Sequence, residues 1–173
     1  MTQELIDLRN CILEGRYADA LAIVDELEGM SKQAILRNIQ VYLIILLIHL
    51  IKNQLEQRLT NSWITSIRNS IREIKKLNIK DNKTSYYINS DEWEKMIEEE
   101  VMEDAIADAS EEVMNGQFTR SQLSAILDKN QILTTAKNFI ALTYTYSPKE
   151  LPAIMDNYLS QLAGGENWIN RQK

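Results

Sequence analysis

Glycine and proline are almost absent from the middle of this chain. The glycines stand at 15, 29, 116, 164 and 165 and the prolines at 148 and 152, so neither occurs from Lys32 to Asn115. Because these two residues most often interrupt regular structure, their absence is typical of long helices. No run of four or more residues alternates cleanly between apolar and polar side chains, which is the pattern of a half-buried strand. The sequence therefore predicts an all-α fold.

Apolar residues recur at three- and four-residue steps in several segments, which is the period of an amphipathic helix. Gly29 is expected to separate the second helix from the third, and Ser31 to cap the third. The sequence predicts a compact bundle of about six or seven helices around a central helix, residues 31–59, that is buried on nearly all sides. The expected helices cover residues 2–14, 16–28, 31–59, 62–77, 90–115, 119–146 with a break near 128–131, and 147–164.

The chain divides by composition into three parts. Residues 1–116 are expected to form a helical core domain. Residues 117–163 carry enough apolar side chains either to pack on that core or to form an interface. Residues 164–173 follow two glycines and are expected to form a flexible tail. The polar stretch 78–89 is the best internal loop.

Several kinds of site are excluded by residue counts. The single Cys11 excludes an internal disulfide, and the single His49 excludes a site built on several histidines. We therefore expect no metal and no cofactor. The apolar run Val41–Ile48 is far shorter than the roughly 18–20 residues of a membrane span, so we expect no membrane association. The start of the chain lacks the features of a secretory signal, and a cytoplasmic location is expected.

Charge is segregated along the chain. Residues 52–83 hold eight basic and three acidic side chains, a net charge of +5, whereas residues 91–112 hold eleven acidic and one basic, a net charge of −10. The basic segment allows weak nucleic-acid binding as one interpretation. The other interpretation is that it lies beside the acidic segment or faces solvent. The overall charge of −6 does not favour nucleic acid as a partner.

Four short motifs occur in a fixed order. They are the acidic stretch Asp25–Lys32 (DELEGMSK), the apolar stretch Leu46–Lys52 (LLIHLIK), Ser62-Trp63, and Ile67-Arg68. In this order, over roughly residues 5–112, they resemble the bacterial, chiefly cyanobacterial, family known as domain of unknown function number 29. The resemblance implies a helical fold and assigns no activity.

The polar residues of these motifs are the candidate site. Carboxylates at the end of a helix oppose its dipole, so Glu28 needs a cation, and Arg68 or Arg72 could grip it. We expect Trp63 to cover that pair, and Glu28, His49, Arg68 and Trp63 to form a polar latch between three helices. The full candidate set, as structural latch or ligand site, is Glu28, His49, Lys52, Ser62, Trp63, Arg68 and Arg72.

No residue is assigned a catalytic role. The chain has no phosphate-binding loop and no nucleophile motif. We therefore expect a non-enzymatic helical protein that acts on a protein partner or on itself, for example as a homodimer. The alternative is a small-molecule or catalytic pocket around His49, Arg68 and Trp63, and the second alternative is nucleic-acid binding through residues 52–83.

Overall fold

A computed structural model describes residues 1–171, and their regular elements are helices. The predicted all-α bundle is confirmed. The chain forms two compact units, residues 1–38 and the residues from Ile39 onward, each of which is described by itself. The boundary between the two units lies at residues 38 and 39. Within the second unit, α5 (Met102–Glu112) and α6 (Arg120–Ile126) pack on each other across residue 116.

Helix α2 is one continuous helix of 40 residues, Tyr17–Glu56. The predicted break at Gly29 and the predicted cap at Ser31 are wrong, since both residues lie inside this helix. Gly29 has an ordinary helical backbone and open space around it. A glycine in a helix costs only about 1 kcal/mol relative to alanine, which is too little to end a helix of this length. The helix ends at Glu56, three residues before the predicted end at Leu59, and the next residue, Gln57, has a φ of 51°.

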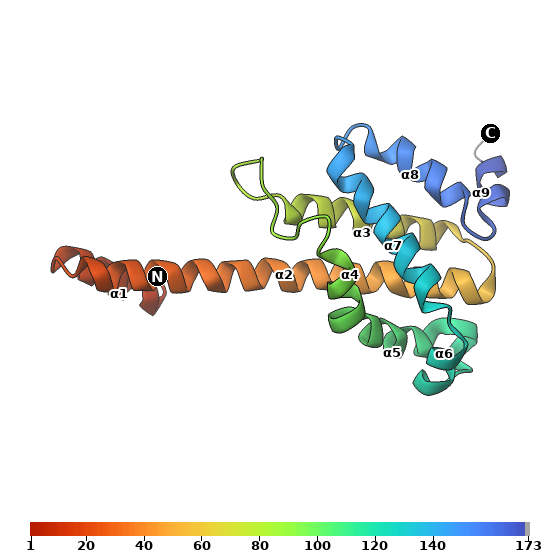
Figure 1. Ribbon diagram of the computed structural model, residues 1–173, viewed down its shortest axis with the longest axis horizontal. Helices are drawn as coiled ribbons and strands as arrows, with labels where there is room; N and C mark the ends of the chain where they lie inside the picture. The colour runs from red at the N-terminus through yellow and green to blue at the C-terminus, as the bar shows by residue number, and fades with distance from the viewer. Residues whose placement is uncertain (172–173) are drawn as a thin grey trace. The chain divides into compact units, whose positions relative to one another are not determined.

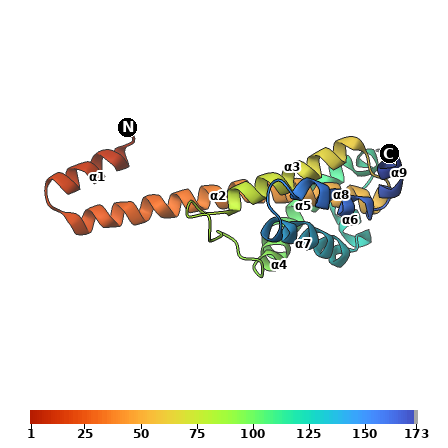
Figure 2. The same ribbon diagram turned by 90° about the horizontal axis from the view of Figure 1, so that it is seen from above.

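The first unit is a helical hairpin. Helix α1, Gln3–Leu13, folds back along the start of α2 (Figures 1 and 2). Gly15 makes the turn with a φ of +72°, a backbone conformation that glycine adopts without strain. The buried apolar residues of this unit are Cys11 and Ala20, one on each helix. The hairpin therefore has very little core of its own.

The second unit has its core along the later part of α2. Ile39, Leu43, Leu46, Leu47 and Ile51 are fully buried. Burial begins only at Ile39, so the prediction of a helix buried nearly all round from residue 31 is wrong: residues 31–34, 37, 38 and 41 are exposed. In Figure 1 this part of α2 lies between α3 (Asn61–Asn78) and α5, and α7 (Lys129–Thr145) crosses it. Helix α8, Leu151–Ser160, packs on α3 and α7.

Helix starts follow the capping signals closely. Thr119 and Gln122 form the capping box of α6, and Asp128 caps α7 after the predicted break. Ser147 and Glu150 exchange the two capping-box hydrogen bonds just before α8. Helix α3 was predicted to begin at residue 62 and begins at Asn61, where the Thr60 hydroxyl accepts the hydrogen bond from the backbone N–H of Trp63.

The predicted helix 90–115 is not a regular α-helix. It consists of α4 (Trp93–Met96), a π-helical segment η1 (Ile97–Val101), α5 and a short 3₁₀ segment η2 (Val113–Gly116). A π-turn is inserted among the glutamates, and such turns are rare inside helices. The α-helix ends at Glu112, after which Met114, Asn115 and Gly116 all have positive φ.

The end of the chain is helical rather than loose as far as it is described. Residues Gly165–Arg171 form α9, which packs on α8, and Trp168 is buried. The last two residues of the predicted tail, 172–173, lie outside the described residues. The polar loop predicted at 78–89 is present as residues 79–92, since Asn78 still belongs to α3. An antiparallel bridge joins Ile79 to Tyr86 within it.

Length and hydropathy alone would let α2 cross a membrane. One window of 18 residues in it has a mean hydropathy of 2.0, and a third of that window is buried in the protein. The core helix of a soluble protein can pass the same test, and from Ile39 onward the buried face of α2 forms the core of the second unit.

Candidate functional site

A groove of about 510 Å³ runs between α3 and α8. Its basic rim comes mainly from α3, where successive turns present cations on one face. Its floor is apolar and includes Leu151 and Met155, both buried. The loop after α3 closes one end with Tyr86. The lining residues are Arg68, Arg72, Lys75, Lys76, Ile79, Lys83, Tyr86, Pro148, Leu151, Pro152 and Met155.

Most of the groove's cations lack a carboxylate partner. Within residues 1–171, Arg72, Lys75 and Lys83 form no ion pair, and Lys76 has only the carboxylate of Glu73 at 3.5 Å. Arg72 donates instead to the side-chain oxygen of Asn69. An anion that entered the groove would therefore meet positive charge that is not already neutralised.

Two of the cations are held firmly by neighbours on other helices. Arg68 binds the carboxylate of Asp156 on α8 through two guanidinium nitrogens. Lys75 donates from Nζ to the backbone oxygen of Thr143 on α7 at 2.6 Å. Burial lowers the pKa of Lys75 from its usual value, because the charged form loses hydration.

The acidic segment 91–112 does not neutralise this groove. Of its eleven carboxylates, three form ion pairs within residues 1–171: Glu94 with Lys137, Glu103 with Lys129, and Glu112 with Lys52. Arg120 also lies 3.7 Å from Glu103. None of these pairs involves a cation of the groove.

A buried polar cluster fixes the loop that closes the groove. The Tyr144 hydroxyl accepts hydrogen bonds from Trp93 Nε1 at 2.6 Å and Asn78 Nδ2 at 3.0 Å, and donates to the backbone oxygen of Ile88 at 2.5 Å. Asn78 also accepts from the backbone N–H of Ile88, and the Tyr86 ring packs edge-on against Tyr144. Burial raises the pKa of Tyr144, so its hydroxyl stays protonated and able to donate.

Of the residues predicted from sequence, the structure brings Lys52 and Trp63 together. Lys52 Nζ lies 4.9 Å from the centre of the buried Trp63 ring, and the Arg58 guanidinium lies 4.7 Å from it. These cations lie beside Glu56 and Glu112 in a shallow hollow. Since the hollow already contains both signs of charge, it has no clear preference for a charged ligand.

Arg68 and Arg72 belong to the groove instead. Arg68 pairs with Asp156, and its guanidinium also lies 5.3 Å from the Trp168 ring. Ser62 is exposed beside the Thr60 hydroxyl, at 3.1 Å, just before Trp63. The sequence missed Asp156 and Trp168, because both lie in the region expected to be an appendage or a tail.

His49 is held within its own helix. Its Nδ1 atom lies 2.8 Å from the backbone oxygen of Ile45, and the ring is half-buried. Burial lowers the pKa of His49 below its usual value of 6.5, with Lys52 lowering it further and the Ile45 bond and Glu112 opposing the shift. The imidazole is therefore neutral near pH 7.

Glu28 is an exposed residue of the first unit, and within residues 1–171 it forms no ion pair. In the second unit, Arg68 pairs with Asp156, Trp63 lies beside Lys52 and Arg58, and His49 lies beside Ile45. The latch with Glu28 and the alternative of one pocket around His49, Arg68 and Trp63 stay predictions.

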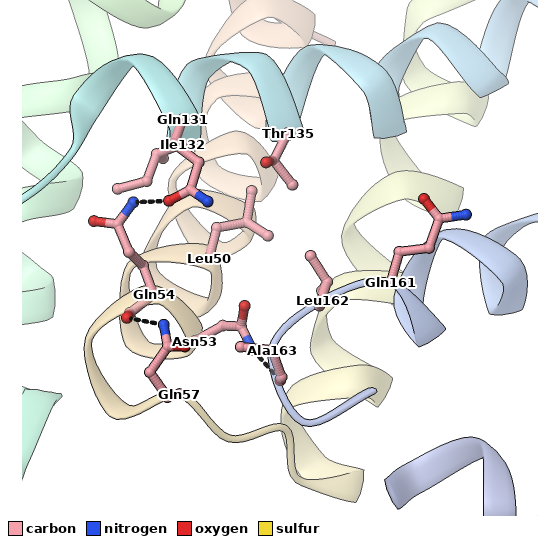
Figure 3. A pocket seen from close by; sticks show the side chains of 10 residues that line it. All are labelled: Leu50, Asn53, Gln54, Gln57, Gln131, Ile132, Thr135, Gln161, Leu162 and Ala163. Atoms are coloured by element: carbon pink, nitrogen blue, oxygen red, sulfur yellow. Dashed lines mark hydrogen bonds between the residues drawn. The ribbon is translucent and has the colours of Figure 1, made fainter. Parts of the chain in front are cut away.

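A second, smaller cavity of about 200 Å³ is lined by carboxamides (Figure 3). The Gln54 amide bonds Gln131 at 2.6 Å, and Gln57 donates to the backbone oxygen of Gln54 (Figure 3). The buried Asn53 donates to the backbone oxygens of Ala163 and Arg58. Most of these polar groups thus bond one another, and they join α2 to α7 and to the turn after α8.

The lining of the groove includes no carboxylate, histidine, cysteine or serine, and its titratable side chains are arginines, lysines and Tyr86. Across residues 1–171 no three His, Cys, Asp or Glu side chains are grouped as a metal site would require.

Comparison with known proteins gives one result. Residues 8–135 match the family described as "Domain of unknown function DUF29", and the resemblance inferred from residues 5–112 is confirmed. The match continues through α6 into the start of α7. No curated protein and no solved structure matches the chain.

Proposed function

Since this chain belongs to the family described as "Domain of unknown function DUF29", whose description assigns no activity, we propose its function from the groove. The protein is a non-enzymatic binding module that holds an acidic, amphipathic segment of a partner protein between α3 and α8. The observation that carries the proposal is a rim of five cations, three without a carboxylate partner, around a buried apolar floor.

The floor supports a protein segment as the occupant. A helix that lies in a groove buries an apolar face while its polar face reaches the rim. Leu151 and Met155 provide an apolar floor, and a methionine side chain adapts to ligands of irregular shape. The carboxylates of such a segment would meet Arg72, Lys76 and Lys83, which are exposed.

Nucleic acid is less well suited to this groove. Single strands bind by stacking their bases on exposed aromatic rings. The one aromatic residue of the lining, Tyr86, is already packed against Tyr144. A phosphate backbone would use the cations but would leave the aliphatic floor without a partner.

Fluorescence anisotropy tests the proposal with defined probes. The first probe is a labelled peptide of about four helical turns, with leucine on one face and glutamate on the other. The second carries serine in place of leucine, the third lysine in place of glutamate, and the fourth is a labelled single-stranded oligonucleotide. We expect the first to bind at least tenfold more tightly than the others. Equal binding of the serine peptide, or tighter binding of the oligonucleotide, would overturn the proposal.

Charge reversal in the groove provides the matched comparison. The double variant Arg72→Glu/Lys83→Glu is expected to weaken binding of the leucine–glutamate peptide about tenfold or more, or 1.4 kcal/mol. The control Lys32→Glu/Lys95→Glu makes the same change in charge at exposed residues outside the groove. It should change the affinity less than threefold. If both variants lose affinity equally, the net charge of the chain is responsible and the groove is not the site.

A further inference from the structure

The hairpin of residues 1–38 exposes an unusual amount of apolar surface. Of the twelve large apolar side chains that are exposed in the described part of the chain, nine lie within the first thirty residues. They are Met1, Leu5, Ile6, Ile12, Leu13, Tyr17, Leu21, Val24 and Met30. The buried apolar residues of the same unit are Cys11 and Ala20, so most of its apolar surface has no partner.

Part of this surface forms one continuous face. In α1, Leu5, Leu8 and Ile12 follow one another at steps of three and four residues, and in α2 Tyr17, Leu21 and Val24 do the same. The buried Cys11 and Ala20 mark the sides on which the two helices meet. Ile12 follows Cys11 by one residue, and Leu21 follows Ala20 by one.

The antiparallel order of the hairpin places both rows on the same side. One residue is a rotation of about 100° around a helix axis. Because the second helix runs in the opposite direction, the same rotation away from the shared contact leads to the same face of the hairpin. We name this face, comprising Leu5, Leu8, Ile12, Tyr17, Leu21 and Val24, the hairpin face.

We propose that the hairpin face binds the hairpin face of a second copy of this chain, and that the two form a four-helix bundle. Two helices with two small buried residues have almost no core, whereas four helices can enclose one. The apolar hairpin face is exposed to water wherever the protein is present. A second copy of the chain is the one partner that is always present with it.

The shape of the hairpin face agrees with a dimer. Five of its six residues are between 42% and 65% exposed, and the face is self-complementary. A mainly apolar notch of about 220 Å³ lies on α1 and is lined by Leu5, Leu8, Arg9, Ile12 and Leu13. On α2, Tyr17 and Leu21 are 65% and 64% exposed.

This arrangement suits a symmetric pair. In a two-fold interface, every contact occurs twice: if one residue of the first copy contacts a second residue of the other copy, the reverse contact also forms. A notch and a protruding side chain on one face therefore both find a partner. Tyr17 or Leu21 of each copy would enter the notch of the other. The proposal does not depend on the groove between α3 and α8, since it uses other residues.

Sedimentation equilibrium of the full chain tests the pairing. The chain has a mass of 20.0 kDa, and we expect twice that mass at micromolar concentration. The variant Ile12→Lys/Leu21→Lys should shift the protein to the single-chain mass, with dissociation at least a hundredfold more favourable. Circular dichroism should show that the variant keeps its helices. A single-chain mass for the unaltered protein up to about 100 μM, well above common dimer affinities, would overturn the proposal.

Two further variants keep the test specific. Ile6→Lys/Met30→Lys makes the same chemical change at two exposed residues that belong neither to the hairpin face nor to the notch, and this control should remain a dimer. Tyr17→Ser/Leu21→Ser removes apolar surface without adding charge and should weaken the dimer as well. If the control dissociates as readily as the face variants, or if both face variants remain dimers, the interface lies elsewhere.

Discussion

The hydroxyl of Tyr144 connects three segments that are far apart in the sequence. It accepts hydrogen bonds from Trp93 and Asn78 and donates to Ile88. Tyr144→Phe would leave buried polar groups without partners, which costs about 1–3 kcal/mol. We expect the free energy of unfolding, measured by urea titration, to fall by that amount.

Tyr146→Phe is the matched control, because Tyr146 lies two residues away and its side chain makes no hydrogen bond in the described chain. Its effect on the free energy of unfolding should stay within about 0.5 kcal/mol. An equal loss in both variants would mean that the Tyr144 hydrogen bonds do not stabilise the fold.

The lowered pKa of His49 predicts that the free energy of unfolding depends on pH. Its pKa is lowered in the folded protein from 6.5, mainly by burial, so the unfolded chain binds the proton more readily. Stability should therefore fall as the pH decreases below 6.5 and level off below the folded pKa. His49→Gln keeps an N–H donor for Ile45 and removes the titration. Urea titrations between pH 7.5 and 5.5 should show a smaller loss of stability in this variant than in the unaltered protein, and identical losses would refute the assignment.

The contacts of single side chains could be predicted from the sequence less well than the fold. His49 was expected in a latch between helices, and in the structure its Nδ1 atom lies 2.8 Å from the backbone oxygen of Ile45, one helical turn away. The partners of Tyr144 and Arg68 come from other helices. Nothing in one sequence indicates which of several buried polar groups will meet.

At the scale of elements, Gly29 provides a direct test of helix α2. If the helix is continuous, Gly29→Ala favours it by about 0.5–1 kcal/mol, because alanine loses less backbone entropy on folding. Hydrogen exchange of the amides of residues 25–33 should then slow roughly two- to fivefold. If Gly29 ended a helix with a positive φ, the same variant would speed exchange.

Gly116→Ala is the opposite case and serves as the comparison. Gly116 has a φ of +76°, and an added Cβ would lie 3.2 Å from the backbone oxygen of Glu111. The variant should lose about 1 kcal/mol or more of stability. The two glycines look alike in the sequence, and only the surrounding structure distinguishes them.

Helix starts could be predicted from the sequence better than helix interiors and ends. A capping box such as Thr119 with Gln122 is local, since the bonds run between residues three apart. The π-helical turn at Ile97–Val101 is not local in this sense. Ile97 and Val101 are both buried, but a regular α-helix would also place residues four apart on one face, so their burial does not account for the turn.

At the scale of the whole molecule, the sequence showed that charge is segregated but not how it is paired. Segments 52–83 and 91–112 carry net charges of opposite sign, and one interpretation was that they lie side by side and neutralise each other. In the structure only Lys52 among the basic residues of that segment pairs with the acidic one. The pairing depends on the fold of residues 117–171, about which the family motifs carried no information.

The cations of the α3–α8 groove have a consequence for the proposed acidic partner. The chain carries a net charge of −6, so such a partner would be repelled while it is distant. The attraction of the groove's cations reaches only about 10 Å at 0.1 M ionic strength. On the proposed function, the fold would therefore act as a filter on orientation, because only an approach that begins close to the groove would be attractive.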